Sequence, residues 1–141
     1  MIEEDQYWSP VYARWIYDRF WSTTRHVFKP MLPSIVWNFL PATVRKDIKK
    51  SLHSQGIGRH TEEEIYNHAE ELIDVFSERL GERPCFLTDA PTVFDAASYG
   101  MFENFILGTQ NLPQKAAAKK HANIVGYTEN LQDSYFPEFK V

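Results

Sequence analysis

Large aromatic side chains recur at helical spacing near the start of the chain, and their types suggest a binding surface. Trp8, Tyr12 and Trp15 are three or four residues apart, so a helix would place them on one face. Arg14 stands beside them and could contact an anionic group. Rings at this spacing form either a buried stripe or a surface for an apolar ligand or partner. The sequence leaves both interpretations open.

A glycine-rich run at residues 56–59 superficially resembles a phosphate-binding loop that leads into a helix. It follows a basic segment instead of a strand, and it lacks a third glycine. The residues at 62–64 are all glutamates, which would repel a phosphate at that helix start. We therefore expect a turn and a helix cap, with Arg59 either binding a carboxylate or pairing with those glutamates.

The histidines and the single cysteine do not indicate a metal site or a nucleophile. His53, His60 and His68 are seven and eight residues apart, which is not the spacing of metal ligands on one helix face. Cys85 has no neighbouring histidine and amide or carboxylate to activate it, so we expect a plain thiol. One cysteine forms no internal disulfide, which suits a reducing compartment and predicts a cytoplasmic location.

Charge is distributed unevenly along a chain whose net charge is −4. Residues 25–60 carry seven Lys and Arg against one Asp, and residues 61–95 carry two against ten acidic residues. Nucleic-acid binding is not expected of an acidic domain. The basic segment at 42–53 has an apolar stripe of only three aliphatic residues and no aromatic anchor. We therefore expect it to pair with the acidic 61–80 segment instead of contacting a membrane surface.

No transmembrane segment is predicted. The longest run without charge, residues 30–44, has 15 residues and contains three prolines. A spanning helix needs roughly 17–25 predominantly apolar residues.

The elements that would position these side chains are helices. Apolar residues recur at three- and four-residue spacing in residues 3–26, 42–53, 61–80 and 115–133, and no stretch alternates as a strand does. Thr61 and Glu64 form a capping box at the start of the third of these segments.

A second capping box, Thr92 with Asp95, opens a helix that differs from the others. Residues 93–107 contain only two charges, and their apolar side chains, Tyr99 and Phe102 among them, point in all directions. Because a helix that is apolar all round is buried, we expect this helix at the centre. The predicted fold is an all-α helical bundle of about five helices around a buried central helix.

Three motifs together resemble the glutathione S-transferase superfamily. They are the aromatic cluster with Arg14, the segment at 55–66 that holds the glycine run and the first capping box, and the segment at 89–96 that holds the second. The chain is most similar to the metaxin-like and failed-axon-connections branch, over about residues 3–139.

The resemblance implies that residues 1–141 are a single C-terminal helical domain and that the family's N-terminal thioredoxin-like domain is absent. Such a domain would contribute dimer contacts and an apolar substrate pocket, lined here by Trp8, Tyr12 and Trp15 with Tyr99 and Phe102 deeper. No cofactor is expected in this chain, because glutathione would require the missing domain. No catalytic residue is assigned.

Two functions stay open at this stage. The chain could be the helical half of a transferase, inactive by itself, or a non-catalytic helical protein-interaction module of the metaxin kind. The expected partner is a second copy of the chain or a thioredoxin-like domain, because removing that domain uncovers apolar surface.

Overall fold

The computed structural model describes the backbone of residues 2–139 and the side chains of residues 8–138. Residues 2–139 form eight α-helices and three short 3-10 helices without a strand, which confirms the all-α prediction. The α-helices are α1 (Ile2–Ile16), α2 (Asp18–Val27), α3 (Ser34–Trp37), α4 (Leu40–Gln55), α5 (Glu62–Leu80), α6 (Val93–Ile106), α7 (Pro113–Ala118) and α8 (Ala122–Tyr135). The 3-10 helices are η1 (Lys29–Met31), η2 (Ile57–Arg59) and η3 (Pro137–Phe139).

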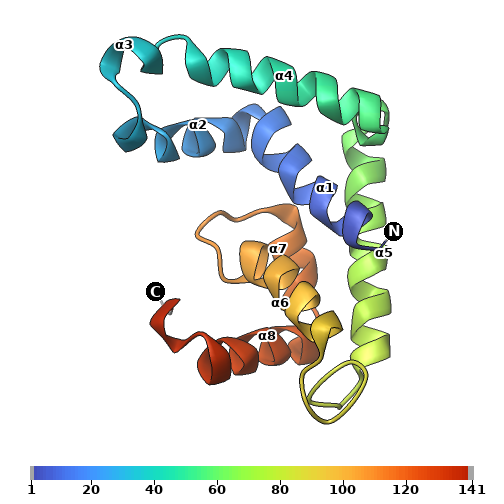
Figure 1. Cartoon of the computed structure of the whole chain (residues 1–141). Helices are drawn as coiled ribbons and strands as arrows, with labels where there is room; N and C mark the ends of the chain where they lie inside the picture. The colour runs from blue at the N-terminus through green and yellow to red at the C-terminus, as the bar shows by residue number, and fades with distance from the viewer. Residues whose placement is uncertain (1, 140–141) are drawn as a thin grey trace.

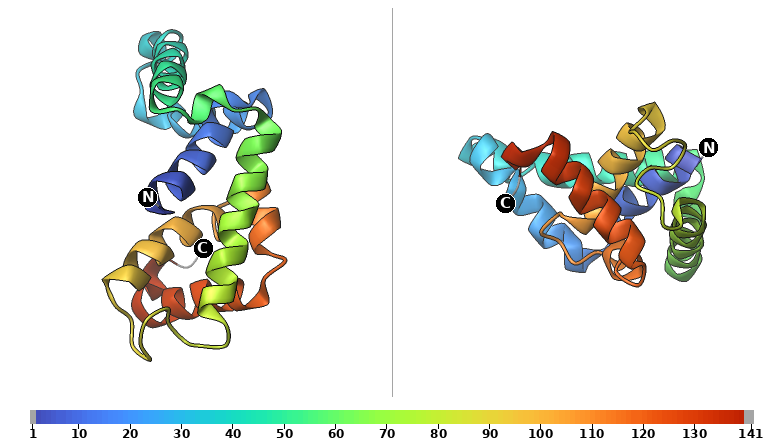
Figure 2. Two further views of the ribbon diagram at one scale, coloured as in Figure 1. Left: turned by 90° about the vertical axis from the view of Figure 1, so that its right-hand side faces the viewer. Right: turned by 90° about the horizontal axis from the view of Figure 1, so that it is seen from below.

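The helices form two levels that α5 connects along one side of the molecule (Figure 1). Helices α2, α3 and α4 make the upper level, which we call the arm (residues 18–60). Helices α5 to α8 make the bundle, and α1 lies between the arm and the bundle. Figure 2 shows α4 at one end of the molecule and the loop between α5 and α6 at the opposite end.

The buried core lies in the bundle. Phe102 of α6 is fully buried and meets the rings of Phe76, Phe105 and Tyr127 edge-on. The contiguous cluster of buried apolar residues takes members from α1, α5, α6, α7 and α8 and from the loop that precedes α6. From the arm, only Phe20 packs against it, and only partly buried. This cluster is therefore built almost entirely without residues 18–60, although Leu52 of α4 is fully buried outside it.

Helix α6 is central but is open on one side, which differs from the expected burial all round. Val93 is 89% exposed, and Gly100 and Asn104, seven and eleven residues later, share that exposed face. The opposite face, with Tyr99, Phe102 and Phe105, packs against the bundle. The apolar composition of α6 thus exceeds what the described residues cover.

The expected helix over residues 3–26 is broken at Tyr17, whose backbone is extended. The break leaves carbonyl groups at the end of α1 without helical partners. Arg45 of α4 donates to the carbonyl oxygens of Trp15 (2.8 Å) and Ile16 (2.7 Å) and to Asp18 Oδ1 (2.7 Å). One side chain of the arm therefore closes the end of α1 and the start of α2.

Candidate functional site

Trp15 lies between two pockets at the junction of α1 with the arm. The apolar pocket, about 170 Å³, is lined only by nonpolar side chains from α1, α2, α4 and the segment before α4: Trp15, Trp21, Phe28, Leu32, Leu40, Pro41 and Val44. The Arg14 pocket, about 340 Å³, is lined by Arg14, Trp15, Thr23, Thr24, Val27, Phe28, Gly108, Thr109 and Gln110. Because Trp15 and Phe28 line both, one continuous aromatic wall separates an apolar site from a more polar one.

Three aromatic rings build that wall. The centre of the Trp15 ring is 5.4 Å from that of Trp21 and 5.8 Å from that of Phe28. The Arg45 guanidinium lies 4.9 Å from the centre of the Trp21 ring, within the range of a cation–π contact. The bonds from Arg45 to the end of α1 hold this cation in place. The apolar pocket is therefore framed by rings that already have fixed partners.

Arg14 forms the floor of the second pocket and joins α1 to the end of α6. It donates to Gln110 Oε1 (2.9 Å) and to the Asn104 carbonyl oxygen (2.8 Å), and it also bonds the Asn104 side chain. Gln110 in turn donates to Thr24 Oγ1 (3.2 Å), which adds α2 to the network. Burial lowers the pKa of Arg14, with Glu103 opposing that shift. The guanidinium donors have protein acceptors, so the predicted contact with an external anion stays a prediction.

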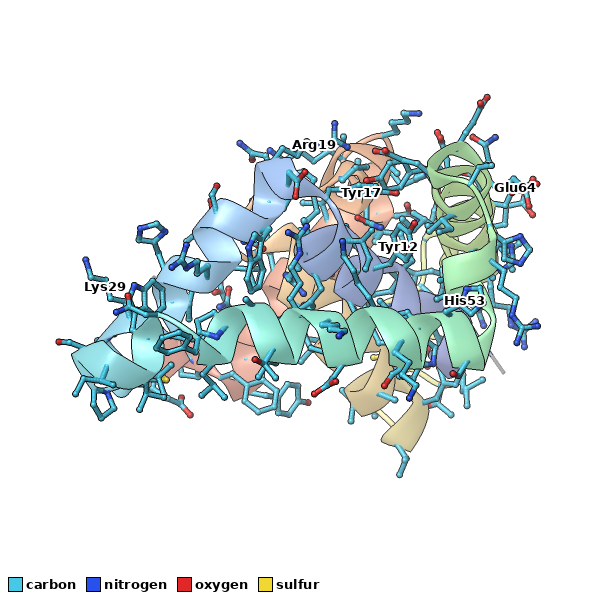
Figure 3. The ribbon with its side chains drawn as sticks, turned by 90° about the horizontal axis from the view of Figure 1, so that it is seen from above. Tyr12, Tyr17, Arg19, Lys29, His53 and Glu64 are labelled. Atoms are coloured by element: carbon cyan, nitrogen blue, oxygen red, sulfur yellow. The ribbon has the colours of Figure 1, made fainter. Side chains whose placement is uncertain are left out.

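The other predicted pocket residues lie in three different places. Trp8 lines a pocket of about 470 Å³ with residues at the end of α4 and the start of α5. Tyr12 meets the ring of Tyr17 edge-on at 5.4 Å, on the side that faces α5 (Figure 3). Tyr99 and Phe102 are buried in the bundle core. None of the pockets described here brings two of these five residues together, and their common role in substrate binding stays a prediction.

A cluster of tyrosines that the sequence reasoning missed joins α2 to α5. Tyr17 and Tyr66 have ring centres 5.5 Å apart, and Arg19 donates to Glu62 Oε1 (3.0 Å) and to the Tyr66 hydroxyl (3.2 Å). Tyr12, Tyr17 and Arg19 lie along this contact in Figure 3. Burial raises the pKa of Tyr17, and its neighbours Tyr66 and Glu62 raise it further. The phenol therefore stays neutral, and the cluster serves packing.

The glycine run closes the end of α4. Gly56 has φ of +125°, which favours glycine, and a Cβ at Gly58 would lie 2.7 Å from the backbone nitrogen of His53. Arg59 donates to the carbonyl oxygens of His53 (3.0 Å) and Ser54 (3.4 Å), which lack helical partners. These bonds give Arg59 a capping position at the end of α4, which differs from the expected pairing with the glutamates at 62–64, and its predicted contact with an anion stays a prediction.

The two capping boxes differ in burial. Glu64 accepts bonds from the Thr61 amide (2.8 Å) and hydroxyl (3.0 Å) at the exposed start of α5, and the bond from that backbone amide lowers its pKa. Asp95 is fully buried and accepts from the amides of Phe86 and Thr92 (both 2.9 Å) and the hydroxyls of Thr92 (2.8 Å) and Tyr127 (3.2 Å). Burial acts to raise the pKa of Asp95, but these bonds together outweigh it and lower the pKa.

Comparison with known proteins addresses the identity of this fold. The family model described as "Glutathione S-transferase, C-terminal domain" matches residues 69–131, which span α6, most of α5, α7 and most of α8. The matched part, which is just under half of the chain, is similar to a glutathione S-transferase C-terminal domain. The match agrees with the resemblance expected from the sequence and includes the second capping box with the buried Asp95, whereas the first capping box precedes it.

Three relatives show the degree of similarity to individual proteins. Failed axon connections of Drosophila melanogaster is 25% identical over 140 residues, which cover 94% of this chain and 34% of that protein. Human metaxin-2 is 26% identical over 94 residues, 65% of this chain and 35% of that protein. The isoprene-epoxide–glutathione S-transferase of Rhodococcus is 27% identical over 147 residues, 96% of this chain and 58% of that protein.

The chain spans about a third of the length of two of these relatives and about three fifths of the third. No solved structure matches it. The similarity is to the metaxin-like and failed-axon-connections branch together with a transferase, so it supports the fold and the branch and leaves the activity to be proposed.

Three further features of the described residues bear on the chemistry of this chain. Among residues 8–138, no three His, Cys, Asp or Glu side chains gather in a group that could hold a metal ion. Cys85 is buried, and burial, with Asp95 and Asp89, raises the pKa of its thiol, which disfavours the nucleophilic thiolate. In the described part of the chain, no helix has the length and hydrophobicity to cross a membrane.

The contacts that sequence reasoning missed come from the arm. Trp21 and Phe28 follow Trp15 by 6 and 13 residues, and the break at Tyr17 shifts their helical register. Arg45 stands in a run of basic residues that gives no local sign of its bonds to α1. No sequence signal would have identified these three residues.

Proposed function

We propose that this chain is the helical half of a glutathione S-transferase-like protein and that it contributes an apolar substrate pocket and dimer contacts. The observation that carries the proposal is the apolar pocket, whose seven lining side chains are all nonpolar and include Trp15, Trp21 and Phe28. Such a lining favours a small apolar ligand, because a polar one would lose its hydration there without compensating bonds.

The substrate class follows from a relative and from the pocket together. The Rhodococcus protein is named for an isoprene epoxide and glutathione. We propose that a small apolar electrophile of that kind is the co-substrate and that it binds in the apolar pocket lined by Trp15. Trp8 is proposed to line a second part of the binding region, with Tyr12, Tyr99 and Phe102 supporting it through packing. Glutathione is proposed to bind a thioredoxin-like domain outside residues 1–141. We also propose a cytoplasmic location, which the single free cysteine supports.

Binding of an apolar fluorescent probe tests the pocket. We expect the uncharged probe N-phenyl-1-naphthylamine to bind residues 1–141, and Trp15→Ala to raise its Kd about tenfold, which corresponds to about 1.4 kcal/mol. Trp37→Ala is the matched control, because Trp37 lines neither pocket at Trp15. Equal Kd values for the two variants would remove the support for this pocket. Micromolar binding of glutathione to this chain by calorimetry would contradict the absence of a glutathione site.

The alternative function is a non-catalytic interaction module, and the open face of α6 favours it. Val93, Gly100 and Asn104 form an exposed face on the most apolar helix of the bundle. We propose that a thioredoxin-like domain or a second copy covers this face. Sedimentation velocity over a range of concentrations tests self-association: Val93→Glu should lower the mass of a dimer, and a parent chain that is monomeric throughout would exclude the second copy.

A further inference from the structure

The outer end of the arm exposes large apolar side chains. Met31 is 72%, Ile35 79% and Phe39 71% exposed, and these three residues lie within nine positions of one another. We call them the apolar tip. Met31 ends η1, Ile35 belongs to α3 and Phe39 directly precedes α4, so the tip is the end of the arm farthest from α5 (Figure 1). Soluble surfaces rarely gather this many large apolar side chains without a partner.

The exposed face of α4 is basic. Lys46, Lys49, Lys50 and His53 are at positions i, i+3, i+4 and i+7, which share one face of a helix, and all four are exposed. The three lysines make no ion pair or hydrogen bond with residues 8–138, although Lys49 contributes to lowering the pKa of Asp18. Asp47 is the one acidic residue in the sequence of α4. The expected pairing of this face with α5 is therefore not found among the described residues.

Phe39 joins the apolar tip to the basic face of α4. The Thr43 amide donates to the Phe39 carbonyl oxygen (3.2 Å), so Phe39 is in helical register with α4. In that register Phe39, Lys46 and Lys50 are at i, i+7 and i+11, along the same line. Figure 3 looks directly onto α4, which crosses the whole view in front of the other helices, with Lys29 near one end and His53 near the other.

We propose that this surface docks on an anionic phospholipid bilayer. Lysines placed along the interface would lie over lipid phosphates, and the apolar tip would enter the boundary between headgroups and acyl chains. Charge complementarity supports the choice, because α4 carries three lysines and one arginine against Asp47, whereas the acidic residues of the chain are concentrated in α5 and in the loop that follows it. The aromatic anchor that the α4 sequence lacks is supplied by Phe39, just before the helix.

A bilayer fits this surface better than a second copy of the chain does. A two-fold dimer through the same face would bring the three lysines of one copy toward those of the other. Such a juxtaposition of like charges costs binding energy, whereas a negatively charged bilayer gains from each lysine. The surface also differs from the open face of α6, so the proposal stands independently of the pocket and partner proposed above.

Co-sedimentation with vesicles tests the proposal. We expect residues 1–141 to bind phosphatidylcholine vesicles that contain about 30 mol% phosphatidylserine, and to bind pure phosphatidylcholine at least about tenfold less. Sodium chloride at about 0.5 M should release most of the bound protein, since screening shortens the reach of the lysines. Lys46→Glu with Lys50→Glu, and separately Ile35→Ser with Phe39→Ser, should each reduce the partition coefficient more than about tenfold.

Two exposed residues elsewhere serve as matched controls. Val75→Ser removes a half-exposed apolar side chain from α5, and Lys119→Glu reverses a charge beside α7, and we expect both to leave vesicle binding within about twofold of the parent. No binding to anionic vesicles, or equal binding to neutral ones, would overturn the proposal. A dimer that the Ile35→Ser, Phe39→Ser variant dissociates would also overturn it, in favour of a second copy. Unchanged circular dichroism of the arm variants confirms that they fold.

Discussion

The bundle and the arm use apolar residues in opposite ways. In the bundle, Ile73, Phe102 and Ile124 are fully buried within one contiguous cluster. In the arm, Met31, Ile35 and Phe39 are mostly exposed, and the described cluster contains no fully buried residue from 18–60. Both regions are helical, so helix formation alone does not distinguish them. The difference lies in what each apolar face meets after the helix has formed.

Polar contacts compensate in the arm for the missing core. Arg45 bonds three acceptors at the junction of α1 with α2, Arg19 joins α2 to α5, and Arg59 caps α4. Because these contacts hold the arm at its base, the arm can present its outer face to a partner while it stays folded. We infer that the bundle supplies stability and that the arm supplies binding surfaces.

The strongest test of this difference is a pair of phenylalanine truncations. Phe102→Ala removes a buried ring from the bundle and should lower the free energy of unfolding by about 3–5 kcal/mol. Phe39→Ala removes an exposed ring from the tip and should change it by less than about 0.5 kcal/mol. Urea unfolding followed by circular dichroism measures both. A loss at Phe39 comparable to that at Phe102 would mean that the tip belongs to the core.

The second test uses the buried carboxylate at the start of α6. Asp95→Asn removes the charge that accepts bonds from Phe86, Thr92 and Tyr127, and it should cost about 2–3 kcal/mol at pH 7. Because folding lowers the pKa of Asp95, its ionised form stabilises the native state fully above its unfolded pKa of about 3.9, and this stability is lost as the pH falls through the lower, folded value. The difference between the parent and Asp95→Asn should therefore shrink below about pH 4.

Urea unfolding of both chains at several pH values between about 7 and 2.5 measures that difference. A gap that stays constant over this range would show that the charge of Asp95 is not the source of its stabilising effect. Reference to the parent at each pH removes the contributions of the other carboxylates, since both chains share them.

The bundle was largely predictable from sequence, and the arm was not. Within the bundle, the single helix expected over residues 115–133 is divided into α7 and α8. Capping boxes and apolar periodicity are local signals, so the positions of α5 and α6 and the central place of Phe102 followed from them. The break at Tyr17 depends on Arg45, 28 residues away, and no local pattern contains that contact. Trp15 was predicted to line a binding pocket and does line one, but the residues that share this pocket with it, Trp21 and Phe28, come from segments whose packing only the fold specifies.

The open face of α6 has the same explanation. Residues 93–107 are apolar enough for complete burial, and the sequence therefore predicted it. The composition of a helix indicates how much of its surface is favourable to bury, whereas the burial that occurs depends on which neighbours are present. The described residues cover one face of α6 only. An excess of apolar composition over observed burial thus becomes evidence for a partner.

The last prediction concerns the free energy of unfolding and tests how tightly the base of the arm is packed. A methyl group added at Gly58 would lie 2.7 Å from the His53 nitrogen and 2.9 Å from the Leu52 carbonyl carbon, both backbone atoms that can move only with α4. Gly58→Ala should therefore lower the free energy of unfolding by roughly 1–2 kcal/mol. Gly100→Ala on the open face of α6 meets no atom within 4 Å and should raise it by about 0.5–1 kcal/mol, through its higher helix propensity. Urea unfolding of the two variants measures both signs. Opposite signs would show that the arm is packed tightly at its base and open only at its tip, whereas a neutral Gly58→Ala would mean that the whole arm is loosely attached.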